Sequence, residues 1–339
     1  MPDRFQDHRE RLARQIGADA IAVVPASRET IRNHDVHPDF RQGSDFYYLT
    51  GFEEPDAVCV LAPGHPDGEF HLFVRPRDRE MEIWNGYRAG TEGALQRFQA
   101  DAAHELSKLD EVLGRMVVGR EVLYYRFGDA AHDDRMTRLL SSARAIGERY
   151  GKRVPTTVGD VGVLIAEQRL RKSPSEVESL SAACELSAEG HREAMRFCLP
   201  GMYEYQVMAA MEYVWREGGS RRNGYPSIVA SGPNAIVLHY VENDRMIDDG
   251  DLVLIDAGAE VDYYSADITR TFPAGGVFSG PQRAVYEVVL AAQHAGIRAV
   301  RPGTTIDDVH EAAKRVLAEG MVDLGLVPRG VDDVLSMHL

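Results

Sequence analysis

The sequence predicts two domains of different class, an α/β domain over residues 1–170 and an α+β domain over residues 171–339. In the first part, short apolar strands alternate with helical segments, which is typical of an α/β domain. In the second part, two helices precede a strand-rich region and two more helices follow it. The length of 339 residues fits two domains, because one domain commonly holds ~100–200 residues.

The elements expected in the first domain follow from hydrophobic periodicity and from turn residues. Helices are expected over Phe5–Ile16, Thr91–Leu113 and Asp133–Tyr150, and strands over Ala20–Pro25, Asp45–Gly51, Ala57–Ala62, Phe70–Val74 and Val122–Tyr125. No GxGxxG or GxxxxGK[ST] pattern follows any of these strands, so the sequence does not predict a nucleotide-binding domain.

In the second domain, capping and helix-breaking residues mark the elements. Ser173 can cap a helix that starts at Pro174, with Glu176 as its capping-box partner. The other expected elements are a helix end near Cys198, a helix over Glu204–Glu217, strands over Ser227–Ser231 and Val237–Tyr240, a hairpin within Asp251–Phe272 that turns at Ala259–Asp262, and helices over Pro281–Val300 and Ile306–Glu319. A Pro-Gly pair joins each pair of helices, so we expect a half-repeat whose second set of strands would follow Leu339.

Composition and charge restrict the class of partner. The net charge of −15 argues against nucleic acid or an anionic membrane as the main partner, because both attract basic surfaces. The charged N-terminal segment has no apolar core and predicts neither a signal peptide nor a membrane span. The three cysteines have no disulfide or metal spacing, so we expect a cytoplasmic protein.

The segment Asp251–Phe272 carries the strongest chemical signal. Asp256 lies in the apolar run Leu252–Ala257, where an unpaired charge costs on the order of several kcal/mol. Asp267 is expected on the adjoining strand, so both carboxylates can point into one pocket. Such a pair resists joint ionisation unless a divalent cation binds between its oxygens. The alternative is that each aspartate serves a turn, a cap or an ion pair, for which Arg270 is a nearby partner.

Two further side chains allow two interpretations each. His239 lies between apolar neighbours, so it is either a core histidine or a group that exchanges protons with a substrate. From its sequence context alone, Trp84 is expected to be a packing residue. Four other aspartates are expected to be loop and turn residues: Asp248, Asp249, Asp251 and Asp262.

Long motifs in both domains resemble the proline-specific metallopeptidases with the pita-bread fold, which include Xaa-Pro aminopeptidase and prolidase. Ser227–Asn243 and Asp251–Pro273 resemble their catalytic domain. Phe40–Phe52 and Arg75–Gly86 resemble the N-terminal domain of bacterial Xaa-Pro aminopeptidase. The resemblance covers nearly the whole chain. It implies an α/β domain of the creatinase/aminopeptidase P N-terminal type, for oligomerisation and active-site access, and an α+β pita-bread catalytic domain that is incomplete.

The resemblance also implies an activity, metal-dependent hydrolysis of the first peptide bond in peptides whose second residue is proline. It places Asp256 and Asp267 among five protein ligands of two divalent metal ions, expected to be Mn²⁺, with Asp267 bridging them. It places His239 at the substrate site as a catalytic residue that handles protons. It places Trp84 at the substrate site of a neighbouring subunit, and a homodimer or homotetramer is expected.

The family's other metal ligands, one histidine and two glutamates, begin with an HGxxHxxG-type segment that is expected beyond Leu339. His338 lacks the following glycine and the second histidine, so it is not expected to be a ligand. We therefore expect these 339 residues, as part of a longer chain, to bind two metals weakly and to expose a sheet edge. The alternatives are a prolidase-type dipeptidase, against which the first-domain motifs argue, and an inactive peptide-binding or oligomerising homologue.

Overall fold

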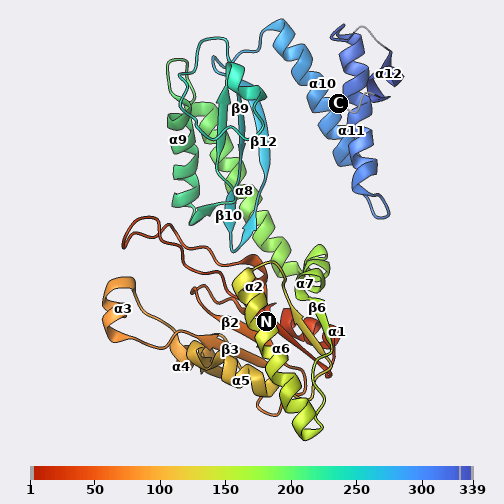
Figure 1. Cartoon of the computed structure of the whole chain (residues 1–339). Helices are drawn as coiled ribbons and strands as arrows, with labels where there is room; N and C mark the ends of the chain where they lie inside the picture. Colours follow the sequence, from red (N-terminus) through yellow and green to blue (C-terminus); the bar gives the residue numbers. More distant parts are fainter. Residues whose placement is uncertain (1–3, 328–329, 337–339) are drawn as a thin grey trace. The chain divides into compact units, whose positions relative to one another are not determined.

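The computed structural model describes residues 4–327 and 330–336 and divides into two compact units (Figure 1). The first unit ends at Ser175 and the second begins at Glu176. None of the helices in these ranges is long and apolar enough to cross a membrane.

A six-stranded mixed sheet forms the centre of the first unit. Its strands are β1 (Ala20–Pro25), β2 (Val58–Leu61), β3 (Phe70–Val74), β4 (Ala102–Glu105), β5 (Val122–Tyr125) and β6 (Thr157–Asp160). Their order is β4-β3-β2-β1-β5-β6, and β1 pairs antiparallel with β2 and parallel with β5. The helical elements are α1 (Arg4–Ile16), α2 (Ser44–Thr50), α3 (Arg79–Asn85), α4 (Gly90–Gln96), η1 (Leu106–Lys108), α5 (Leu109–Met116), α6 (Ala130–Tyr150) and α7 (Val161–Leu170).

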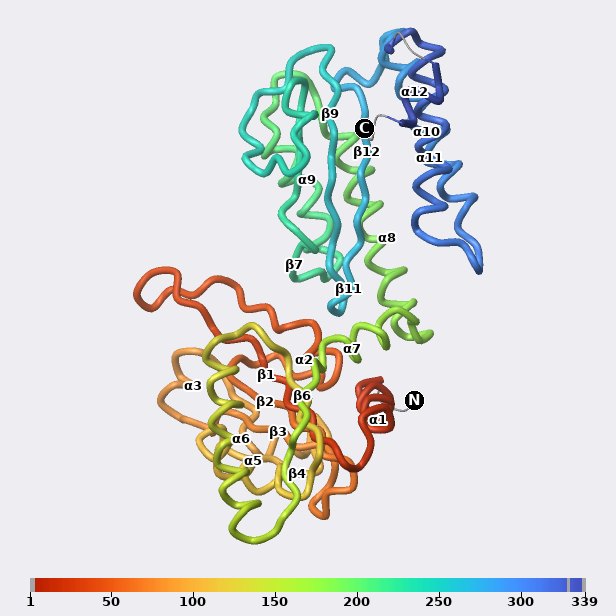
Figure 2. The backbone as a smooth tube through the Cα atoms, turned by 45° about the vertical axis from the view of Figure 1, so that its right-hand side comes forward, coloured from red at the N-terminus to blue at the C-terminus, as the bar shows by residue number. Residues whose placement is uncertain are grey.

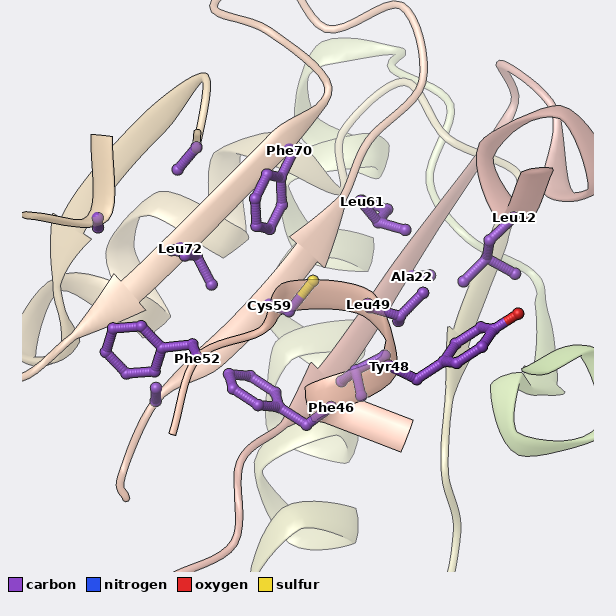
Figure 3. Close-up of a cluster of buried hydrophobic side chains, with 14 of the residues drawn as sticks. Leu12, Ala22, Phe46, Tyr48, Leu49, Phe52, Cys59, Leu61, Phe70 and Leu72 are labelled. Atoms are coloured by element: carbon purple, nitrogen blue, oxygen red, sulfur yellow. The ribbon is translucent and has the colours of Figure 1, made fainter. Parts of the chain in front are cut away.

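Helices cover both faces of this sheet, because successive residues of a strand point to opposite sides. On one face, Ala22 of β1 packs with Leu12 of α1 and Leu49 of α2, in the cluster drawn in Figure 3. On the other face, Ile21 packs with Leu113 of α5 and with residues of α6. Each fully buried leucine in these clusters contributes about 1.5–3 kcal/mol.

Two predictions for the first unit are wrong. The aromatic segment Asp45–Gly51 was expected to be a strand, but it forms α2. Phe46 and Leu49, three residues apart on one helix face, are both buried, and Gly51 ends the helix with a φ of 64°. The long helix expected over Thr91–Leu113 is divided into α4, β4 and α5, because β4 pairs with β3 at the edge of the sheet.

The second unit contains two small antiparallel sheets. Its strands are β7 (Arg222–Asn223), β8 (Ile228–Ser231), β9 (Leu252–Ala257), β10 (Ala259–Val261), β11 (Tyr264–Ser265) and β12 (Ile268–Pro273), and their orders are β12-β9-β8 and β11-β10-β7. Its helical elements are α8 (Pro174–Phe197), α9 (Glu204–Glu217), η2 (Gly232–Ile236), α10 (Gly280–Ala299), α11 (Ile306–Asp323) and α12 (Val331–Ser336). Helices α10 and α11 lie side by side (Figure 2).

The β12-β9-β8 sheet has one closed and one open face. Val253 and Ile255 of β9 are fully buried in a cluster with Met211 and Trp215 of α9. The alternate residues of β9, among them Asp256, are only half-buried. The strand alternation therefore places the Asp256 carboxylate on the face away from the α8/α9 core.

The predicted start of α8 at Pro174 and both ends of α9 are confirmed. The prediction of a strand over Val237–Tyr240 is wrong. This segment comes directly after η2 and forms a turn and an open loop. The hairpin turns at Asp262–Tyr263 and not across Ala259–Asp262. Both turn residues have a positive φ, which is the geometry of a two-residue type I′ turn.

Candidate metal and substrate site

The hairpin brings Asp256 and Asp267 together. Asp256 lies on β9 and pairs with Thr269. Asp267 was expected within the adjoining strand, but it lies one residue before β12. Gly258 allows this approach, because a Cβ atom there would lie 1.9 Å from the backbone oxygen of Ala266. The local backbone therefore requires glycine beside the two carboxylates.

A tyrosine hydroxyl joins the two carboxylates. The Tyr225 hydroxyl lies 2.5 Å from Oδ1 of Asp256 and 3.2 Å from Oδ1 of Asp267. Burial, followed by the hydrogen bond to Asp256, raises the pKa of Tyr225 well above its usual range, so the hydroxyl keeps its proton and donates. Sequence reasoning missed Tyr225, because a tyrosine in the loop between β7 and β8 carries no spacing signal.

The pair fits a divalent cation in its chemistry. Its oxygens converge on one hydroxyl and are the hard ligands that Mg²⁺ and Mn²⁺ prefer. Within residues 4–327 and 330–336, no group of three or more His, Cys, Asp or Glu side chains is placed to hold a metal. His338 lies outside the described residues.

The ion-pair alternative for the two aspartates fails. The Arg270 guanidinium donates to the backbone oxygen of Thr269, and no ion pair between Arg270 and Asp256 or Asp267 occurs in the described part of the chain. By contrast, the expected turn aspartates do serve local structure. Arg245 binds Asp248 at 2.7 Å and Asp251 at 2.5 Å.

His239 lies in the same unit as the two aspartates. It is an exposed residue of the turn after η2, so the interpretation as a core histidine is wrong. An exposed imidazole on a loop can reach a substrate and exchange protons with it.

Trp84 lies in the first unit, on α3. Its side chain is 80 % exposed, so the packing interpretation is wrong. Asp78 caps α3, and Arg77 forms a bidentate pair with Glu82. This short helix therefore presents the indole to solvent from a locally fixed backbone.

Comparison with known proteins defines the class of this site. Residues 5–124 match the family described as "Aminopeptidase P, N-terminal domain", and residues 178–333 match "Metallopeptidase family M24". The second match contains both aspartates and His239. The chain is therefore an M24 metallopeptidase chain with an aminopeptidase P N-terminal domain, and the pita-bread fold expected from the resemblance is confirmed.

Individual relatives narrow the class. The chain is 38% identical over 336 residues to the Xaa-Pro aminopeptidase of Escherichia coli (strain K12), covering 98% of this chain and 76% of that protein. It is 33% identical to human Xaa-Pro aminopeptidase 3, covering 92% and 62%. The solved structure of Pseudomonas aeruginosa aminopeptidase PepP matches with a TM-score of 0.95 at 44% identity, covering 98% and 75%. The chain belongs to the Xaa-Pro aminopeptidase family.

Proposed function

We propose that this chain acts in the removal of the N-terminal residue from peptides whose second residue is proline, by metal-dependent hydrolysis. The observation that carries the proposal is the convergence of Asp256 and Asp267 on one tyrosine hydroxyl, in a chain of the Xaa-Pro aminopeptidase family. A structural ion pair would neutralise these carboxylates with a basic side chain, whereas here they lie together on the half-open face of a sheet.

The metal proposed for this site is a pair of Mn²⁺ ions. Asp256 and Asp267 would hold them, because carboxylate oxygens suit this ion. Bound divalent ions would activate water and polarise the carbonyl of the scissile bond. A solved structure described as zinc-substituted E. coli aminopeptidase P in complex with product, 38% identical, belongs to a relative with the same fold.

The other proposed roles belong to His239 and Trp84. We assign His239 to the substrate site, where its imidazole would donate a hydrogen bond to the oxygen that becomes negatively charged as the peptide bond is attacked. We assign Trp84 to the substrate site of a second copy of this chain, in a homodimer or homotetramer. Exposed Ile83 (78 %) and Tyr87 (90 %) extend its apolar surface and support such a contact. All three cysteines are free thiols, which supports a cytoplasmic location.

The test is hydrolysis of Xaa-Pro-Xaa peptides by the full-length protein with Mn²⁺, beside Xaa-Pro dipeptides and Xaa-Ala-Xaa peptides. We expect cleavage only before proline, with the tripeptide as a substrate. Asp267→Asn should nearly abolish cleavage, whereas Asp262→Asn, at the exposed turn of the same hairpin, should not. Cleavage of dipeptides alone would identify a dipeptidase, and full activity of Asp267→Asn would refute the metal role.

A further inference from the structure

The loop that carries His239 has little regular structure of its own. Between β8 and β9, residues 232–251 form η2, turns at residues 238–239 and 249–250, an isolated β-bridge from Met246 to Tyr203, and otherwise irregular backbone. The His239 side chain is exposed, and no hydrogen bond from it to another described residue is present. A side chain in this situation keeps one orientation only if the loop is fixed by other residues.

One buried carboxylate binds Ser231, which directly precedes the loop, and Tyr240 and Arg245 within it. Glu204, the first residue of α9, is completely buried. Its Oε1 accepts from the Ser231 backbone N–H at 2.6 Å and from the Ser231 hydroxyl at 2.7 Å. Its Oε2 accepts from the Tyr240 hydroxyl at 2.7 Å and from the Arg245 backbone N–H at 3.0 Å. Four donors within 3.0 Å, with a longer contact of 3.5 Å from Asn234 Nδ2 to Oε1, therefore occupy the roughly four acceptor positions of the carboxylate.

The side chains of Arg245 and Tyr240 complete the hydrogen bonding around Glu204. Arg245 also donates through Nη1 to the Ser231 hydroxyl at 2.7 Å and to Oδ2 of Asp251 at 2.5 Å. Burial, followed by the hydrogen bond to Glu204, raises the pKa of Tyr240 to about 12, so its hydroxyl stays a donor at neutral pH. A buried carboxylate is tolerated only with such a complete set of partners.

The three contacts hold the loop on both sides of the histidine. Ser231 is the last residue of β8 and directly precedes the loop, and Arg245 lies in the loop after His239. Tyr240 is the residue directly after His239, and its ring is buried against the sheet in a cluster with Ile228. The backbone at residue 240 therefore has a fixed position and direction, which limits where the adjacent imidazole can point.

We infer that Glu204 is the positioning residue of His239, acting through Ser231, Tyr240 and Arg245 to hold the loop in one conformation. The inference rests on the proposed role of His239 at the substrate site. Glu204 itself is fully buried, so it acts on the reaction through the loop and not by contact with the peptide.

A double-mutant cycle tests this role. Glu204→Gln keeps the shape of the side chain, but one carboxylate oxygen becomes an amide nitrogen. This nitrogen is itself a donor, so it would face two donors that now bind an acceptor. We expect it to lower kcat/KM by about 10- to 100-fold, mainly through kcat, since a displacement of about 1 Å can cost that much. In a His239→Ala background, the same change should lower kcat/KM less than about twofold, because the group that it positions is absent.

A matched control separates positioning from general destabilisation. Glu176 is also buried, and its carboxylate accepts from the Tyr264 hydroxyl at 2.6 Å, outside the His239 loop. Any decrease in kcat/KM caused by Glu176→Gln should be the same in the wild-type and the His239→Ala background. If the loss caused by Glu204→Gln were also independent of His239, the inference would be overturned.

A second measurement does not depend on activity. In protein labelled with ¹³C-histidine, the His239 ring signal is assigned by its loss in His239→Ala. It should shift or broaden in Glu204→Gln and stay in place in Glu176→Gln, and an unchanged signal in Glu204→Gln would refute the inference. If Glu204→Gln does not fold, Tyr240→Phe, which removes a single donor, takes its place with the same expectation. Failure of the wild-type protein to cleave Xaa-Pro peptides would refute the proposed function, while the ring signal would still decide the positioning role.

Discussion

The Tyr225 hydroxyl lies 2.5 Å from Oδ1 of Asp256 and also bonds to Asp267, so a single proton donor holds the two carboxylates together. Two carboxylates this close repel each other unless a donor or a cation lies between them. The tyrosine thus maintains the spacing of the proposed metal ligands, and a hydrogen bond to a charged group contributes about 1.5–3 kcal/mol.

Tyr225→Phe should therefore weaken metal binding. Mutation of a residue that orients metal ligands typically lowers the metal affinity by about 10- to 100-fold. We expect that loss in a calorimetric titration of the full-length protein with Mn²⁺. Tyr213→Phe, on the exposed side of α9, serves as the control. An unchanged Mn²⁺ affinity in Tyr225→Phe would show that the hydroxyl does not orient the ligands.

Gly258→Ala should damage the same site through the backbone. A Cβ atom at Gly258 would lie 1.9 Å from the oxygen of Ala266 and 3.3 Å from the nitrogen of Asp267, so the strands must separate. We expect a loss of at least about 1–3 kcal/mol in the free energy of unfolding, as for other overpacked sites, together with loss of Mn²⁺ binding. Gly280→Ala, where nothing lies within 4 Å, should be close to neutral. Equal unfolding free energies for the two variants would contradict this explanation.

Elements with strong local signals were predictable from the sequence. Helix α9 matches its expected bounds, because Gln206 caps the backbone N–H of Tyr203 and a Gly-Gly pair follows Glu217. The aspartate pair was also visible, since a charged residue inside an apolar run stands out. Both signals depend only on neighbours in the sequence.

The contacts that organise the site could not be predicted in this way. Tyr225 and Asp256 are 31 residues apart, and Glu204 and Tyr240 are 36 residues apart. In each case the important property is a hydrogen bond made only after the strands and helices pack. His239 is likewise exposed because residues 237–240 form a turn and loop in place of the expected strand, and Glu204 accepts a hydrogen bond from Tyr240 in this loop.

Trp84→Ala should affect catalysis without affecting stability. The indole is 80 % exposed, so its removal should change the free energy of unfolding by no more than about 0.5 kcal/mol. If Trp84 contacts substrate in a neighbouring subunit, KM for Xaa-Pro-Xaa peptides should rise and the melting temperature should stay constant. Tyr150→Ala, which removes an exposed aromatic side chain at the end of α6, controls for a general loss of apolar surface. A lower melting temperature with unchanged kinetics would instead identify Trp84 as a packing residue.

The first unit should lose stability in mild acid through His132, whose imidazole is buried beside the Tyr125 ring with Nε2 lacking a partner among the described residues. Burial lowers the pKa of His132 below its usual 6.5. The unfolded chain therefore binds more protons than the folded one once the pH falls below about 6.5, and stability decreases as the pH falls further through the folded-state pKa.

His132→Phe should flatten the dependence of the unfolding free energy on pH between about pH 5 and 8, measured in urea on metal-free protein. Equal slopes for wild type and His132→Phe would show that His132 takes up no additional proton on unfolding.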